Sequence, residues 1–425
     1  MKSKLLRVFS SILLFNVLVI YMPSTASGML IAALISALLL LLNYANGVLF
    51  ASSALVCTLI LEALLRLTGG VLPSPYYRPH EFLVEGDRYR SNEDVSMLSP
   101  HGDLLAIDPT LDRALAYPKQ LEFKTDSIGY RNVTDYGGEK LILIGDSFVV
   151  GNGNTQADSL SEIMRREQGI SSYSMAFPNG PLGYSRIADE ARTRFGPDIC
   201  LVIAFFEGND FQPIDKQDLA LRQMTPSLLR TVAKNYSATL KEWFEVSKVF
   251  YGLYTQSLEK IRLSIASTQA SSGNLLSESK TIVEQVGGTS MAFLSGYAEV
   301  TRREEYDDFG FLENQLASSR PDLVLFIPEK YRVYSALMNR PVQQLPDAQL
   351  SLLRRVTSDL GIELIDSTKA LEERSRVLLE SGEFTFWPDD THWNRNGIEV
   401  AAKLLAAGLL NSTAPACVAA APSNE

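Results

Sequence analysis

The sequence predicts an α/β fold with a central parallel sheet, because short apolar runs alternate with stretches of helical spacing. The apolar runs are rich in Val, Ile, Leu and Phe and occupy residues 140–146, 198–206, 322–328 and 362–366. Apolar runs with little alternation are typical of parallel strands that are buried on both faces. Helical patterns fall between them, at residues 156–168, 184–195 and 348–360. This alternation indicates a doubly wound sheet with helices on both faces.

Length and charge narrow the class of protein. The chain has 425 residues, 46% of them hydrophobic, which is enough for one large or two modest domains with real cores. The net charge is −10; residues 1–70 carry +3, so the rest of the chain carries −13. An acidic body disfavours nucleic acid and anionic membrane surfaces as partners.

Three cysteines are scattered along the chain. Cys57 lies in an apolar span, Cys200 in a predicted strand and Cys417 near the C-terminus. This spacing indicates neither a metal site nor a disulfide framework. So few cysteines still allow an exported domain.

The N-terminal residues have the pattern of a membrane region. Residues 5–22 match one bilayer crossing, and residues 28–67 are too long for a single span of about 20 residues. Polar residues and a glycine near position 45 interrupt the second stretch. We therefore expect two to three transmembrane helices within residues 1–68; a signal peptide followed by one anchor is the alternative.

Positive charge before the first apolar stretch places the N-terminus in the cytoplasm. Three spans would then put the rest of the chain outside the membrane, and two spans would leave it inside. With three spans, we expect a protein of the cytoplasmic (inner) membrane whose catalytic domain faces the periplasm or the cell exterior.

The remaining chain divides into four expected parts. Residues 69–137 are mixed and read as a linker leading into the main domain. The main α/β domain covers residues 138–411. Within it, residues 214–320 break the strand–helix rhythm and are expected to form a helical insertion. Residues 412–425 are expected to be a disordered tail.

Ser147 follows the first apolar run in "LILIGDSFVVGNG" and is the candidate nucleophile. A serine nucleophile needs a base, usually histidine. Of the three histidines, His80 and His101 lie beside prolines in the irregular N-terminal region, whereas His392 lies in "FWPDDTHWNRNG" just before a predicted helix. Asp389 and Asp390 precede His392 by three and two residues, and a carboxylate this near can orient the imidazole.

Two further turns supply candidate donors for an oxyanion. Gly208, Asn209 and Asp210 follow the second apolar run, and Gly180 lies in the turn "MAFPNGPLGY". The carboxyl ends of parallel strands share one edge of the sheet, where ligands bind. The Asn209 amide and the Gly180 backbone N–H are therefore candidates to stabilise negative charge beside Ser147.

These four motifs, in this order, resemble those of the SGNH (GDSL) hydrolase family. The resemblance covers about residues 120–410, excluding the insertion, and implies a three-layer, flavodoxin-like fold. It assigns the family's four positions to Ser147, Gly180, Asn209 and His392, with the Ser147 backbone N–H also in the oxyanion hole. Gly183 is the alternative to Gly180. The triad acid is Asp389 by analogy with most esterases of the family and Asp390 by analogy with its alginate-type members; both are candidates, with a slight preference for Asp389.

Three other stretches resemble membrane-anchored bacterial members related to alginate O-acetylation proteins. They are "TDSIGYRN", "FIPEKYRVY" and "DTHW", which begin at residues 125, 326 and 390. The resemblance implies a serine esterase or O-acyltransferase that acts on carbohydrate esters through an acyl-enzyme. Lys330 and Tyr334 are either substrate contacts or structural residues, and a structural role is the expected one.

The resemblance also sets expectations for partners. We expect a carbohydrate or other ester substrate, the lipid bilayer and polysaccharide-biosynthesis proteins as partners, without nucleic acid. No metal or organic cofactor is required by this chemistry.

Two other functions compete with the enzyme hypothesis. One is a catalytically inactive protein on the same fold that binds polysaccharide or acts as an assembly scaffold through the insertion. Its weakness is that binding alone does not need a serine, a histidine and an acid together. The other is a flavodoxin-like nucleotide or phosphate binder. That hypothesis lacks a Gly-Lys-Ser/Thr loop and leaves His392 unexplained.

Overall fold

The computed structural model describes residues 60–64, 67, 83–85, 88–108, 110–178, 180–211, 249, 280–306, 310–342 and 344–421. The expected membrane region at residues 1–68 lies almost entirely outside these ranges. Within them, no helix has both the length and the apolar character needed to cross a bilayer.

A five-stranded sheet forms the centre of the molecule, and all of its strands run parallel. In spatial order it contains β11 (Glu363–Asp366), β10 (Leu323–Ile327), β7 (Cys200–Phe206), β5 (Leu141–Ile144) and β6 (Ser172–Ser174). Counted along the chain, this is the order 2-1-3-4-5 of a flavodoxin-like sheet. The order reverses between β5 and β7, and ligands of open α/β sheets bind at such a point.

The three central strands are apolar along their whole length because both of their faces are covered. Every residue of β5, β7 and β10 is buried. The predicted strands at residues 140–146, 198–206, 322–328 and 362–366 are thus confirmed to within two residues at each end.

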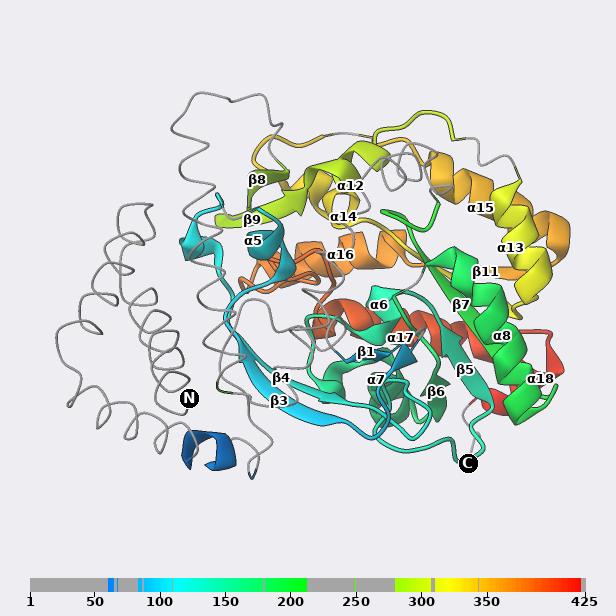
Figure 1. Cartoon of the computed structure of the whole chain (residues 1–425). Helices are drawn as coiled ribbons and strands as arrows, with labels where there is room; N and C mark the ends of the chain where they lie inside the picture. Colours follow the sequence, from blue (N-terminus) through cyan, green and yellow to red (C-terminus); the bar gives the residue numbers. More distant parts are fainter. Residues whose placement is uncertain are drawn as a thin grey trace, which may run out of the picture.

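Helices cover both faces of the sheet and complete three layers (Figure 1). On one face, α8 (Pro181–Phe195), α13 (Phe311–Ser319) and α15 (Ala348–Leu360) pack against one another. On the other face lie α7 (Leu160–Gln168), α16 (Thr368–Leu379) and α17 (Arg395–Asn411). The parallel-sheet α/β architecture predicted from the apolar runs is confirmed.

Residues 83–124 form structure that packs on the domain. They include β1 (Val84–Glu85) with β2 (Arg88–Tyr89), a longer antiparallel pair of β3 (Asp94–Ser99) with β4 (Lys119–Lys124), and α5 (Asp103–Ile107). Tyr89 and Phe123 are buried in the main hydrophobic core. The expected linker at residues 69–137 therefore includes an integral part of the domain.

The expected helical insertion at residues 214–320 differs from the structure where the two can be compared. Residues 281–294 form an antiparallel hairpin of β8 (Thr281–Val286) and β9 (Thr289–Leu294), followed by α12 (Ser295–Val300). Most of residues 212–279 lie outside the described ranges.

The C-terminus also differs from expectation. Instead of a disordered tail, residues 412–421 include helix α18 (Pro415–Ala420), in which Cys417 is buried. Cys417 forms a disulfide with Cys200 at the start of β7. The inference that the cysteines form no disulfide was therefore wrong for this pair, because residues 217 positions apart in sequence meet at one edge of the sheet.

Candidate active site

Ser147 lies at the carboxyl end of β5 and begins the short helix α6 (Ser147–Val150). Asp146 caps this helix, since its Oδ1 accepts a hydrogen bond from the Phe148 backbone N–H at 2.9 Å. Gly145 is required for close approach, because a Cβ at this position would lie 2.4 Å from Val149 Cγ2. The Gly-Asp-Ser sequence thus forms a sharp strand-to-helix turn with the Ser147 side chain only partly buried.

His392 lies in the loop before α17, and neighbouring side chains fix this loop against α6. The Trp393 indole N–H donates to the Phe148 carbonyl at 3.1 Å, and the Asn154 amide donates to the Trp393 carbonyl at 2.9 Å. Asn394 caps α17 by accepting from the Asn396 backbone N–H at 2.9 Å. The Asp-x-His-Trp motif therefore places a histidine beside the nucleophile turn and anchors it with the next tryptophan.

Ser147, His392 and Asp390 form one continuous hydrogen-bonded chain. His392 Nε2 lies 2.9 Å from Ser147 Oγ, and His392 Nδ1 lies 2.8 Å from Asp390 Oδ1. An ionised carboxylate only accepts hydrogen bonds, so the proton of the neutral imidazole is placed on Nδ1. Nε2 is then free to accept the proton of the Ser147 hydroxyl, which is the arrangement of a serine nucleophile with its base.

Asp389, the slightly preferred triad acid, points away from His392. Its Oδ2 accepts hydrogen bonds from the backbone N–H groups of Gly102 at 2.6 Å and Tyr117 at 2.7 Å. The preference for Asp389 over Asp390 is therefore corrected. Consecutive residues of the loop project in different directions, and only Asp390 faces the imidazole.

Charges around the imidazole favour its protonated form. Burial opposes a charge on His392, but the hydrogen bond and charge of Asp390, and then the charges of Asp103 and Asp146, outweigh burial and raise its pKa. Burial likewise opposes a charge on Asp390, but Lys119 and His392 hold the pKa of this carboxyl well below its usual range. These opposite shifts favour an ionised Asp390 beside a protonated His392.

The expected oxyanion donors follow neighbouring strands of the same edge. Gly180 precedes α8 with a φ of 66°, a left-handed conformation that favours glycine. The Gly183 backbone N–H donates to the Gly180 carbonyl at 3.0 Å, so this donor is already used. Asn209 is exposed and follows β7. Burial raises the pKa of neighbouring Asp146, and a hydrogen bond from the Asn209 side chain is among the effects that oppose this rise.

Arg131 supports the nucleophile turn and was not identified as a site residue from the sequence. This buried guanidinium donates to the carbonyls of Val150, Gly151, Glu122 and Asn154 at 2.8–3.0 Å. Burial lowers its pKa to about 10, so it remains charged at neutral pH. Its presence in the "TDSIGYRN" motif was the available signal.

Lys330 and Tyr334 make structural contacts. The three N–H groups of Lys330 Nζ are shared among four backbone carbonyls, those of Ala292, Trp387, Pro388 and Asp390, at 2.7–3.1 Å. The Tyr334 hydroxyl accepts from the Thr385 backbone N–H at 2.9 Å. Both residues are fully or almost fully buried. Their hydrogen bonds to residues 385–390 hold the His392 loop in place, in agreement with the structural role expected for them.

Two groups in the described part of the chain have ligand-type atoms close enough for a metal. One contains Cys200, Asp322 and Cys417, and the other Asp103, Asp390 and His392. The first has no free thiol, because its two cysteines form the disulfide. In the second, both imidazole nitrogens already contact Ser147 and Asp390. Neither group fits a metal ion without losing these bonds.

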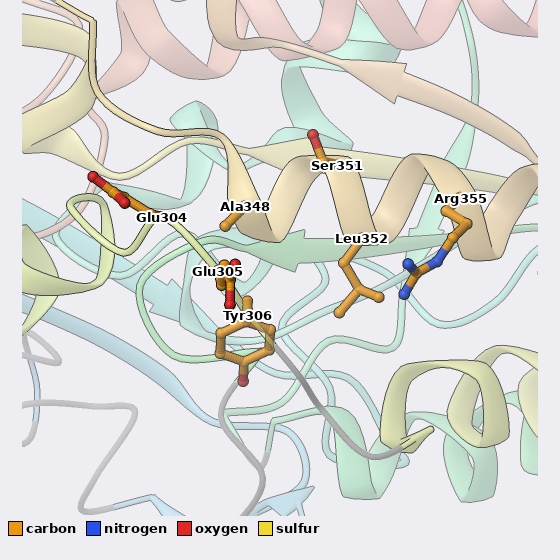
Figure 2. A pocket seen from close by; sticks show the side chains of 7 residues that line it. All are labelled: Glu304, Glu305, Tyr306, Ala348, Ser351, Leu352 and Arg355. Atoms are coloured by element: carbon orange, nitrogen blue, oxygen red, sulfur yellow. The ribbon is translucent and has the colours of Figure 1, made fainter.

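A cavity of about 550 Å³ lies apart from the triad, between residues 304–306 and α15. Figure 2 shows its lining, in which Glu304 and Arg355 lie at opposite sides and the aromatic ring of Tyr306 lies between them, beside Glu305 and near Leu352. None of its lining residues belongs to the triad. We assign it no role in the chemistry.

The fold and the site together define a class: an α/β protein whose serine, histidine and aspartate meet at the carboxyl edge of a parallel sheet. Residues 312–423 match the family model of the SGNH hydrolase-like domain of acetyltransferase AlgX. The match confirms the resemblance to SGNH-like proteins of alginate O-acetylation and supports an esterase- or acyltransferase-type enzyme. It includes Asp390 and His392 but begins after Ser147 and does not cover it. No curated protein matches the chain.

Proposed function

We propose that this protein is a membrane-anchored serine esterase or O-acyltransferase that acts on carbohydrate esters outside the cytoplasm. The observation that carries the proposal is the Asp390–His392–Ser147 chain, with its contacts of 2.8 and 2.9 Å. A purely binding or scaffold protein would have no need of this chain.

In the proposed mechanism, His392 removes the Ser147 proton as Ser147 Oγ attacks the ester carbonyl. Asp390 stabilises the imidazolium that forms. The backbone N–H groups of Ser147 and Gly180 and the Asn209 amide bind the tetrahedral oxyanion. His392 then protonates the leaving alcohol, which leaves an acyl group on Ser147. Water completes hydrolysis, or a sugar hydroxyl completes transfer.

The disulfide supports the proposed location. Disulfides form and persist in oxidising compartments and are rare in the cytosol. Cys200 and Cys417 lie on the domain that would face the periplasm or cell exterior. The apolar residues 5–22 and 28–67 would supply the anchor, and polysaccharide-biosynthesis proteins of the same membrane are the proposed partners.

Labelling with a fluorophosphonate tests the proposal directly. The wild-type chain is expected to react, and Ser147→Ala is expected to lose all labelling. His392→Ala should reduce the labelling rate by about 10³-fold or more, since the serine loses its base. Absence of wild-type labelling, under conditions where a reference serine esterase reacts, would contradict a catalytic role.

Hydrolysis and transfer are separated by the fate of the acyl group. p-Nitrophenyl acetate is the donor, and an oligosaccharide is added as acceptor. Acetylated sugar among the products identifies an acyltransferase. Acetate alone, at saturating acceptor, shows that the acyl group passes to water and not to that sugar, as in an esterase.

A further inference from the structure

Residues 102–119, which lie 270 or more positions before the His392 loop, pack directly against it. The Gly102 backbone N–H donates to Asp389 Oδ2 at 2.6 Å, and the Leu104 backbone N–H donates to the Asp389 carbonyl at 3.2 Å. In return, the Thr391 backbone N–H donates to Asp103 Oδ1 at 2.8 Å. The two segments thus exchange hydrogen bonds in both directions.

Lys119, at the start of β4, lies beside the triad acid. Its Nζ is 3.1 Å from Asp390 Oδ2 and 3.7 Å from Asp389 Oδ1, and its side chain is only 4% exposed. The ammonium group also lies 4.4 Å from the centre of the Trp387 ring. A buried cation is screened little by salt, so its effect on Asp390 is strong. Lys119 occupies the side of Asp390 that His392 leaves open.

Asp103, at the start of α5, approaches the same Nδ1 edge of the imidazole as Asp390. Its Oδ2 is 3.6 Å from His392 Nδ1, and the Thr391 hydroxyl donates to the same oxygen at 2.5 Å. A second carboxylate at this distance stabilises a positive charge on the ring without replacing Asp390 as its hydrogen-bond partner. The imidazole therefore faces two carboxylates, one of which is paired with a lysine.

We propose that Asp103 and Lys119 are two oppositely charged positioning residues that together set the proton affinity of the His392–Asp390 dyad. Lys119 keeps Asp390 ionised and oriented, and Asp103 stabilises the imidazolium. The inference rests on the proposed function, because it assigns a purpose to the dyad. It also makes the segment before the α/β domain a part of the active site.

Other charged groups face the dyad and are kept constant in the test. Asp146 at the start of α6 also raises the pKa of His392. Lys330 of α14 (Lys330–Tyr334) interacts with both Asp389 and Asp390, and burial lowers its pKa to about 8. Tyr297 of α12 is half-buried near Asp146 and Asp103, and burial and then these carboxylates raise its pKa above its ordinary value.

The two charges have opposite expected effects on the pH profile. Fluorophosphonate labelling requires neutral His392, so its rate falls at acidic pH. Asp103→Asn removes a charge that stabilises the imidazolium, and we expect the labelling rate at pH 5.5, relative to pH 8, to rise at least about threefold. Lys119→Met removes a cation and leaves Asp390 easier to protonate, so the same ratio should fall at least about threefold. Lys119→Arg should stay near wild type.

The neighbouring exposed pair Asp94 and Lys124 supplies matched controls. Asp94 lies on β3 and Lys124 on β4, the strand that begins with Lys119, and Lys124 Nζ is 3.0 Å from Asp94 Oδ2. Asp94→Asn and Lys124→Met should leave the ratio unchanged. The proposal would be overturned if Asp103→Asn and Asp94→Asn gave equal rate ratios. It would also be overturned if Asp103→Asn and Lys119→Met changed the ratio in the same direction. If Lys119→Met fails to fold, the rate ratio of Asp103→Asn compared with that of Asp94→Asn still tests the proposal.

NMR titration of the full-length Ser147→Ala chain separates this inference from the proposed function. Labelled histidine gives three ring signals, and His392→Gln identifies that of His392. Asp103→Asn should move the His392 titration midpoint to lower pH. If the His392 titration midpoint does not move, the inference is contradicted even where the wild-type enzyme is labelled normally. A moved midpoint supports it even where wild-type labelling fails.

Discussion

Asp389 and Asp390 are neighbours in sequence, but their side chains have different partners. Asp390 contacts the imidazole, whereas Asp389 binds two backbone N–H groups of residues 102–117. Both are buried. Asp390 is therefore the acid of the proposed triad, and Asp389 attaches residues 102–117 to the His392 loop.

Substituting each aspartate by asparagine should separate these two roles. In Asp390→Asn, the amide cannot act as an anion toward Nδ1–H, and we expect the labelling rate to fall by about 10³–10⁴-fold. Asp389→Asn loses hydrogen bonds made to a charged acceptor and should cost about 1.5–3 kcal/mol of stability. Its labelling rate should stay within about tenfold of wild type.

Labelling kinetics and urea denaturation of the two variants provide the measurements. A near-normal rate in Asp390→Asn, together with loss of labelling in a fully folded Asp389→Asn, would return the triad to Asp389.

The sequence could predict residues whose role depends on local motif order. Ser147, His392 and the pair of candidate acids were found in this way. It could not choose between Asp389 and Asp390, because the choice depends on which side of a loop faces α6. Asp103 and Lys119 were missed for a similar reason: their partners lie 287 and 271 positions away.

At the scale of elements, the end of α6 depends on a single guanidinium. The carbonyls of Val150, Gly151 and Asn154 converge on Arg131 where the helix ends, and Gln156 Oε1 accepts from Arg131 Nε at 3.1 Å. The Glu122 carbonyl brings β4 to the same group. Arg131 therefore joins the nucleophile turn to the strand that carries Lys119.

Arg131→Met should destabilise the protein by at least about 3 kcal/mol, since several buried carbonyls lose their donors at about 1–3 kcal/mol each. Arg131→Lys should recover little of this loss, because an ammonium cannot reproduce the planar fork. The free energy of unfolding in urea gives the measurement. Arg165→Met is the control: among the described residues this exposed arginine forms an ion pair with Glu162 of α7 alone, and we expect a change within about 0.5 kcal/mol. Equal effects of the two methionine variants would contradict the role of Arg131.

Elements with a strong period were predictable, and those inside an unusual segment were not. The apolar runs located β5, β7, β10 and β11 because buried parallel strands have no polar face. The β8–β9 hairpin was not predicted, because residues 214–320 were expected to form a helical insertion. Its signal was nevertheless present: Gly287 and Gly288 separate two β-type runs and adopt φ values of 56° and 84°, as two-residue hairpin turns require.

At the scale of the whole molecule, the disulfide joins the C-terminal helix to the central sheet. Cys200 begins β7, and α18 carries Cys417 across the end of the domain. The sequence could not predict this pairing, because three cysteines without a spacing pattern give no information about which two meet. Only the topology brings the last helix to the first residue of the middle strand.

Removing this disulfide should lower stability without changing the chemistry. Cys417→Ser, or Cys200→Ser, is expected to cost about 2–4 kcal/mol, because a cross-link over 217 residues restricts the unfolded chain. The labelling rate at 25 °C should stay near wild type, since neither cysteine contacts the triad. Urea denaturation of the variants, and of wild type with and without reductant, gives the measurement.

Cys57→Ser supplies the control, because it removes a cysteine and leaves the pair intact. Thiol counting adds an independent check. Denatured protein from an oxidising compartment should show one free thiol before reduction and three afterwards, given three cysteines in the chain. Three free thiols before reduction would show that the disulfide is absent, and the proposed location outside the cytoplasm would lose its structural support.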